Sequence, residues 1–282
     1  MLRSRLAILG AAILWSTAGA AIKLAQLSSW QIAGGRSLVA CVTLALLFRA
    51  GRRRVSAKGL WVALAYAATV VLFVVATKLT TAANAIFLQD TAPLYVMVLS
   101  PLLLRERPSR GELVAAPIFL LGLALFFVDR LEAGQVLGKL IALASGVAFA
   151  LCIVGLRATH AEGTPVLVWG NGIAALIALG PAVAVSPAVP NATDVGILLF
   201  LGVFQLGAAY ALFQLGLRET PATEASLLIL VEPVLNPIWT FLLTGERPGP
   251  WAVVGGAIIL VATAWRTVAG ARAVGTAPAR SA

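Results

Sequence analysis

The sequence predicts an all-α integral membrane protein whose ten transmembrane helices form two inverted five-helix repeats. Three observations support this fold class. Of the 282 residues, 60% are hydrophobic and only 11% are charged, with a mean hydropathy of +0.97. The apolar residues fall into runs of about 20, the length of a helix that crosses a bilayer. A long segment in the first half of the chain also recurs in the second half.

The composition excludes an ordinary soluble protein, because soluble domains average about 45–50% apolar and about 25% charged residues. The net charge of +10 does not indicate a nucleic-acid partner, since the basic residues lie in short loops rather than in one stripe. Cys41 and Cys152 lie inside apolar runs, and His160 is the only histidine. We therefore expect no disulfide framework, no metal site and no cofactor.

Each expected helix is an apolar run bounded by turn-forming or charged residues. In chain order the runs are 6–25, 31–48, 59–78, 82–104, 112–128, 137–156, 165–185, 194–217, 222–243 and 251–266. Polar stretches separate most of them, in order "RAGRRRVSAK", "RERPSRGE", "DRLEAGQ", "RATHAEGTP", "SPAVPNATD", "RETPATE" and "TGERPGP".

The distribution of basic residues predicts the orientation of these spans. With the N-terminus inside, fifteen Lys and Arg residues fall on the inner side and four on the outer side. This asymmetry follows the positive-inside rule, so both termini are expected in the cytoplasm of a bacterial cell, with the spans in its inner membrane. A cleaved signal peptide at the N-terminus is the alternative, and it would leave nine spans and an incomplete repeat.

The repeat relates "TTAANAIFLQDTAPLYVMVLSPLLLRERP", from Thr80, to "TPATEASLLILVEPVLNPIWTFLLTGERP", from Thr220. Shifted by 140 residues without a gap, ten of the 29 positions are identical. They include a mid-helix proline and the tripeptide Glu-Arg-Pro, which chance similarity between apolar helices does not explain. Five spans in each half invert the second half, an architecture typical of transporters. We expect repeats at 1–130 and 131–270, followed by a disordered cytoplasmic tail at 271–282.

The chain resembles the EamA-type transporters of the drug/metabolite transporter superfamily. The resemblance covers residues 6 to about 266 and rests on "LWSTAGAAIKLA", "GGRSLVA" and "AAYALFQLGLRETPATEASLLILVEPVLNPIWTFLLTGERP". It implies two inverted five-helix bundles around a central cavity, alternating access, and export of a small metabolite such as an amino acid. Members of this family carry very different solutes, so the resemblance does not identify the substrate.

Charged residues within spans are the main site candidates, because each costs about 2.5–3.5 kcal/mol to insert. Asp90 and Glu232 lie near the middle of repeat-equivalent helices but do not align with each other. Arg36 in the second span is the expected cationic partner of Asp90. This pair is either a structural clamp or a site that contacts a charged substrate or carries a proton.

Glu232 shares a helix face with Asn236 and Trp239, at spacings of four and three residues. An acid, an amide and an aromatic ring on one face suit a solute that bears an ammonium group. The alternative is a protonated Glu232 that is hydrogen-bonded to a neighbour, which a proton-coupled carrier also requires. Further candidate cavity residues are Trp15, Tyr95, Gln205 and Tyr210. The mid-helix prolines Pro93, Pro233 and Pro237 are candidate hinges or fixed kinks.

These features predict a secondary active transporter for a small polar metabolite. Its expected partners are the solute, the lipid bilayer and protons, without nucleic acid, and both a monomer and a dimer are compatible with the sequence. An uptake carrier or a channel is the alternative. An intramembrane enzyme is disfavoured because the sequence has no H-E-x-x-H or G-x-S-x-G motif.

Overall fold

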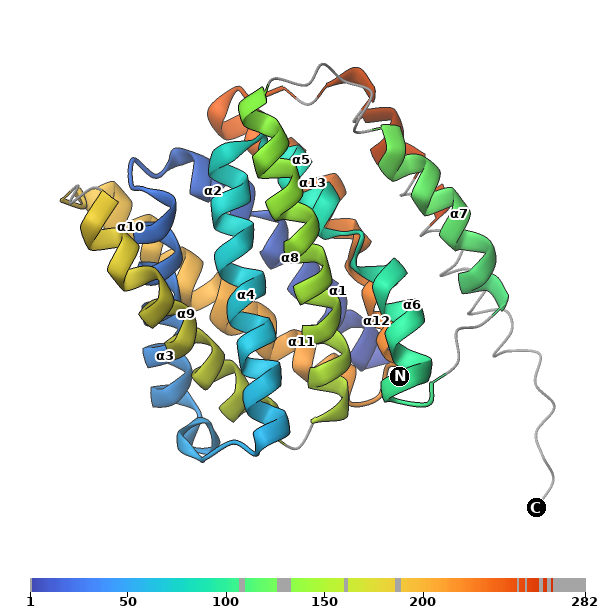
Figure 1. Ribbon diagram of the computed structural model, residues 1–282, viewed down its shortest axis with the longest axis horizontal. Coiled ribbons are helices and arrows are strands. Elements are labelled where there is room, and N and C mark those ends of the chain that lie inside the picture. Colours follow the sequence, from blue (N-terminus) through green and yellow to red (C-terminus); the bar gives the residue numbers. More distant parts are fainter. Residues whose placement is uncertain are drawn as a thin grey trace.

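The structure is a computed structural model in which every described element of secondary structure is a helix (Figure 1). It describes residues 2–106, 110–125, 133–159, 162–185, 189–247, 249–251, 253–258, 261–262 and 265. The expected tail at 271–282 and His160 lie outside these residues.

Eight described segments are long and apolar enough to cross a membrane. Four of them are uninterrupted, namely α3 (Ser29–Leu47), α4 (Ala57–Leu79), α8 (Ala133–Ala158) and α9 (Gly163–Val185). The other four are built from consecutive shorter helices. These are α1 (Leu2–Ser16) with α2 (Ala18–Leu24), α5 (Ala82–Gln89) with α6 (Ala92–Leu103), α10 (Ala192–Phe200) with the π-helix η3 (Leu201–Ala208) and α11 (Ala209–Leu217), and α12 (Ala222–Leu228) with the 3-10 turn η4 (Ile229–Val231) and α13 (Glu232–Thr244). A second 3-10 turn, η1 (Arg49–Arg52), follows α3.

The fifth and tenth predicted spans are not among these eight segments. α7 (Arg110–Leu125) occupies the fifth, and the structure describes an apolar helical stretch at Leu113–Gly122 within it. The tenth lies partly outside the described residues, and its described residues are helical. Figure 1 shows α7 at the edge of the bundle, beside this C-terminal segment. The all-helical membrane fold is therefore confirmed with eight candidate spans, while the count of ten stays a prediction.

The two repeated segments run in opposite directions through the bundle. The first, α5 with α6, begins beside the end of α13, where the N–H of Ala82 donates to Glu246 Oε1 at 2.8 Å. The second, α12 with α13, begins beside the end of α6, where the N–H of Ala222 donates to Glu106 Oε2 at 3.1 Å. The sequence repeat is thus an antiparallel pair of neighbouring segments in space.

Contacts at the start of α1 identify the two faces of the bundle. Arg5 Nε lies 2.7 Å from Glu224 Oε1 in the first turn of α12. The Ser4 hydroxyl donates to Glu219, and this hydrogen bond lowers the pKa of the Glu219 carboxyl. We call this side, where α6 also ends, the N-terminal face, and the side where α13 ends the opposite face.

Both repeated segments break at equivalent positions because of a proline. Pro93 and Pro233 lie in the first turn of α6 and of α13. Proline lacks an N–H for the carbonyl four residues earlier, and its ring collides with that carbonyl. The carbonyls concerned belong to Gln89, at the end of α5, and Ile229, at the start of η4. These two prolines therefore mark helix restarts, whereas Pro237 lies inside α13.

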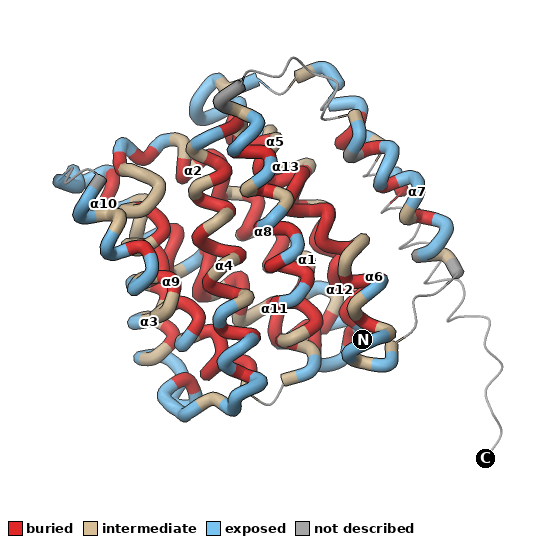
Figure 2. The backbone as a smooth tube through the Cα atoms, viewed as in Figure 1, coloured by how far each residue is buried: buried red, intermediate tan, exposed pale blue. Residues whose placement is uncertain are grey.

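The core runs through the centre of the bundle, where Figure 2 shows the buried positions of α1, α4 and α8. α1 contributes Ile8, Ala11 and Ala12, which are fully buried, so the first predicted span is part of the core. Small residues let the helices approach closely. A Cβ on Gly216 of α11, for example, would lie 2.7 Å from the carbonyl oxygen of Ser4.

Gly146 of α8 packs against the break between α5 and α6. A Cβ here would lie 2.8 Å from both the Gln89 carbonyl oxygen and Thr91 Oγ1. Gly146→Ala is therefore expected to destabilise the protein by about 1–3 kcal/mol through overpacking, measured by unfolding of the solubilised protein. The control is Gly196→Ala on α10, where nothing lies within 4 Å of the added Cβ and stability should hold or rise slightly. Equal stabilities of the two variants would contradict this packing.

Candidate functional site

A small polar cavity lies between the two repeats, at the level of the helix breaks. It is lined by Trp15 of α1, Arg36 of α3, Thr69, Val70 and Phe73 of α4, Gln89 of α5, Phe149 of α8, Gln205 and Leu206 of η3, Tyr210 of α11 and Glu232 of α13. About 20 Å³ is open to the centre of a water molecule, which is room for about one water. In this conformation the cavity is too small for a metabolite.

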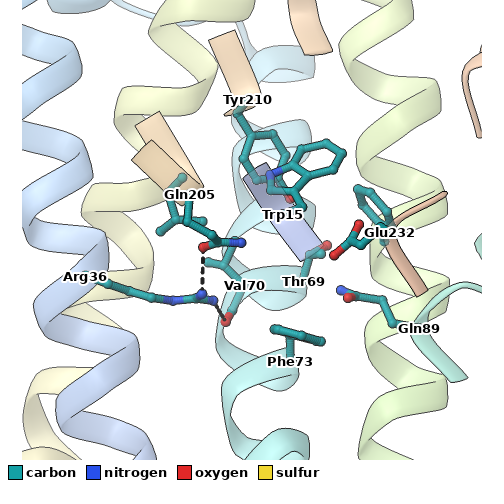
Figure 3. A pocket seen from close by; sticks show the side chains of 11 residues that line it. Trp15, Arg36, Thr69, Val70, Phe73, Gln89, Gln205, Tyr210 and Glu232 are labelled. Carbon is teal, nitrogen blue, oxygen red and sulfur yellow. Dashed lines mark hydrogen bonds between the residues drawn. The ribbon is translucent and has the colours of Figure 1, made fainter. Parts of the chain in front are cut away.

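Arg36 is the cation of this cavity, and its side chain is 1% exposed. Its Nη1 donates to Gln205 Oε1 at 3.0 Å and its Nη2 donates to the Val70 carbonyl oxygen at 2.7 Å (Figure 3). Its Nε has no hydrogen-bond partner. Among the residues that the structure describes, no carboxylate lies within ion-pair distance of this guanidinium.

The predicted pairing of Arg36 with Asp90 is therefore wrong. Asp90 ends α5 at the helix break, where it is buried and neither carboxyl oxygen has a hydrogen-bond partner. Arg36 instead bonds to a glutamine of the π-helix η3 and to a backbone carbonyl of α4. Both partners are neutral, so the charge of Arg36 is solvated by dipoles and is not neutralised by a protein carboxylate.

Glu232 is the acid of the cavity. It is the first residue of α13, is buried, and lies across the cavity from Arg36 in Figure 3. Asp90 does not line the cavity, and it follows the end of α5, a helix that packs against α13. The breaks in two neighbouring helices thus each carry an acid, and the repeat does not align these two acids.

Aromatic rings form one wall of the cavity. Trp15 packs edge-on against Tyr210, with ring centroids 4.6 Å apart, and against Phe149 at 5.7 Å. Tyr210 also packs against Tyr66 at 4.5 Å. The Trp15 Nε1–H has no hydrogen-bond partner. Three of the predicted site residues, Trp15, Gln205 and Tyr210, line the cavity.

Three other predicted residues lie outside the cavity lining. Asn236 is fully buried against α2, where its Oδ1 would be 2.3 Å from a Cβ on Gly19. Trp239 Nε1 donates to Ser16 Oγ of α1 at 3.1 Å. Tyr95 is half-buried and packs against the apolar core. The face shared by Glu232, Asn236 and Trp239 is therefore divided, with only its acid at the cavity.

Sequence reasoning did not single out the cavity residues Gln89, Thr69, Phe73 and Phe149. Gln89 is held by Ser145, since its Nε2 donates to Ser145 Oγ at 2.9 Å and this hydroxyl donates to the Thr69 carbonyl oxygen at 3.1 Å. Gln89 carried a usable signal, because it is a polar residue next to Asp90 in an apolar run. The two phenylalanines carried none. No group of three or more potential metal ligands occurs among the described residues.

Comparison with known proteins identifies the family. The profile of the EamA-like transporter family matches residues 2–128 and 136–267. The chain belongs to the EamA-like transporter family. The two matches correspond to two repeats, and the membership makes this EamA-like protein a multi-pass membrane transporter.

Similar proteins agree with this assignment. An "Uncharacterized transporter" of Archaeoglobus fulgidus is 30% identical over 207 residues, which cover 70% of this chain and 72% of the relative. The "Uncharacterized transporter YwfM" of Bacillus subtilis is 26% identical over 271 residues, 90% of each chain. Both relatives are named as transporters, in agreement with the family of this chain.

One solved crystal structure has the same fold. It superposes with a TM-score of 0.75 over 95% of this chain and 98% of that chain, at 19% identity. At this identity the likeness shows the fold alone.

Proposed function

We propose that the protein is a secondary active transporter that exports a small polar metabolite, such as an amino acid or a related compound, by alternating access. The observation that carries this proposal is the pair of opposite charges in one cavity. Arg36 has no carboxylate partner among the described residues, and Glu232 lies across the cavity from it. An amino acid brings a carboxylate for the first and an ammonium group for the second.

The unpartnered donors support this orientation of the solute. The Nε–H of Arg36 and the Nε1–H of Trp15 both belong to cavity-lining side chains and have no acceptor. A carboxylate accepts from such donors through charge-assisted hydrogen bonds, which are stronger than neutral ones. The aromatic faces of Trp15 and Tyr210 favour a nearby ammonium group through the cation–π interaction.

The two neighbouring acids support coupling to protons. Two carboxyl groups that share a buried apolar site are not both ionised readily, because burial and mutual repulsion both disfavour the second charge. Asp90 and Glu232 therefore hold a proton when the cavity is without solute, and the ammonium group competes with this proton. Export of solute in exchange for an incoming proton follows from that competition.

The small size of the cavity supports a carrier over an open pore. Its space for about one water requires the bundle to open before a metabolite enters, and an inverted repeat opens by moving one half against the other.

The excess of basic residues on the N-terminal face supports placing both termini in the cytoplasm and the spans in a bacterial inner membrane. The proposed direction of transport, export, rests on the family resemblance. Uptake is the alternative, and flux measurements distinguish the two.

Thermal stability in the presence of matched probes tests the proposed substrate class. Leucine carries both charges, whereas isoamylamine and 4-methylpentanoate carry one each on a similar carbon chain. Leucine at about 100 times its Kd is expected to stabilise the purified protein by about 2.7 kcal/mol, with smaller effects of both analogues. A panel of other amino acids covers side-chain preference. Stabilisation by amines, purines or sugars but by no amino acid would overturn the proposed class.

A further inference from the structure

Glu106 and Glu246 form reciprocal links between the two repeats. They are repeat equivalents, 140 residues apart, and so are their partners Ala82 and Ala222. Glu106 accepts the N–H of Ala222, and Glu246 accepts the N–H of Ala82, at 3.1 and 2.8 Å. The carboxylate that follows each broken helix thus caps the N-terminus of the other broken helix, where a negative charge is favoured.

The backbone that presents each glutamate is also repeated. Arg105 and Gly245 directly precede the two glutamates, are repeat equivalents, and are the residues with positive φ in the described part, at 59° and 74°. This left-handed conformation ends a helix and turns the chain. A glycine adopts it freely, whereas an arginine rarely does. The turn has thus kept its conformation at Arg105 without the help of a glycine.

A basic side chain completes each link from a third helix. Arg157 at the end of α8 lies 2.9 Å from Glu106 and also donates to the Leu217 carbonyl oxygen at 2.6 Å. Lys23 at the end of α2 lies 3.2 Å from Glu246 and donates to the Thr80 carbonyl oxygen at 2.8 Å. One link lies at the N-terminal face and the other at the opposite face. All four charged side chains are 22–25% exposed, so water reaches both links.

The links lie at opposite ends of the two broken helices, which carry Asp90 and Glu232 at their breaks. α5 leads from Ala82 to Gln89, the residue before Asp90, and α13 leads from Glu232 to Thr244, two residues before Glu246. Movement of the start of α12 away from Glu106 separates the repeats at the N-terminal face alone. Movement of the start of α5 away from Glu246 separates them at the opposite face alone. With both links formed, the cavity has room for about one water.

We propose that Glu106 and Glu246 are the two gates of the carrier, each closing the cavity toward its own face. Opening to one side breaks one link while the other holds the repeats together. This inference rests on the proposed alternating access, but it needs no particular substrate. Loss of either carboxylate charge therefore shifts the conformational equilibrium toward opening at the face of that carboxylate.

Thiol labelling from each side of the membrane tests these gates. Thr69→Cys places a reporter in the cavity, in a background where Cys41→Ala and Cys152→Ala remove the native thiols. A membrane-impermeant maleimide is added from either side of sealed vesicles, whose orientation is read from an N-terminal tag. Glu106→Gln is expected to raise labelling from the side of the N-terminal face by about tenfold and to lower it from the other side. The tenfold change corresponds to the loss of one helix cap. Glu246→Gln is expected to do the reverse.

Glu162→Gln is the matched control, because Glu162 also accepts a backbone N–H, that of Ser56 at 2.9 Å, but this N–H belongs to the N-cap residue of α4 and not to a broken helix. It should leave both labelling rates unchanged. Glu106→Ala and Glu246→Ala should enlarge the shifts, and thermal unfolding checks that each variant is folded. The proposal that these glutamates are gates would be overturned if Glu106→Gln and Glu246→Gln shifted labelling toward the same side. It would also be overturned if both variants were folded and neither changed the labelling. Labelling is measured without solute, so a wrong substrate class leaves this result intact, and a failed gate leaves leucine binding intact.

Discussion

Arg36→Gln is expected to weaken binding of an amino-acid-like solute by at least about 30-fold. Loss of one partner of a buried, hydrogen-bonded charge pair costs about 2–5 kcal/mol, and 2 kcal/mol corresponds to about 30-fold in Kd. The glutamine removes the charge that faces the solute carboxylate, while its amide can still donate to Gln205 or to the Val70 carbonyl. Calorimetric titration of the purified variant with leucine measures the change.

Two further variants show whether the effect belongs to this guanidinium. Arg54→Gln removes an exposed arginine from the loop after α3 and should leave the Kd unchanged. Arg36→Lys keeps the charge but loses the planar fork that now reaches both Gln205 and Val70, so its Kd should lie between those of the parent and Arg36→Gln. An unchanged Kd for folded Arg36→Gln would remove Arg36 from the site.

Asp90→Asn is expected to abolish solute accumulation driven by a proton gradient while preserving solute exchange. Asparagine keeps the shape of the side chain but cannot hold a proton, and it no longer repels Glu232. In the parent, solute binding should strengthen as the pH rises, because the acids lose the proton that competes with the ammonium group. In Asp90→Asn, binding should persist to lower pH. Proteoliposomes loaded with labelled solute measure exchange and gradient-driven flux separately.

Glu232→Gln provides the contrast, because Glu232 lines the cavity and Asp90 does not. It should lose binding of zwitterionic solutes and therefore both kinds of flux, while the protein still inserts in the membrane. Parental rates and parental pH dependence in both variants would show that neither acid takes part in transport.

The positions of the spans along the chain were predictable, because span length and the repeat are properties of the sequence itself. Apolar runs of about 20 residues located the eight spans to within a few residues. Pro93 and Pro233 indicated the helix breaks, because the missing N–H is a property of the residue itself.

The partners of the site residues were less predictable, because helix rotation and the neighbours in space decide them. The prediction paired Arg36 with Asp90 on charge alone. The π-helix η3 turns Gln205 toward Arg36, and the sequence has no clear signal for such a turn. Asn236 and Trp239 share a helical face with Glu232, but close packing at Gly19 directs them to α1 and α2. Periodicity identified this face without revealing which helix covers it.

The two acids near the cavity are carried unequally by helices that otherwise match. Asp90 aligns with Leu230 and Glu232 aligns with Ala92. Glu106 and Glu246, in contrast, align with each other. A solute arriving from one leaflet therefore meets a different protein surface from a solute arriving from the other. Half-saturation concentrations then differ between the two directions, while net flux still follows the gradients across the bilayer. The repeat gives the two halves similar helices, and the single-residue differences at Asp90 and Glu232 make the two sides of the site unequal.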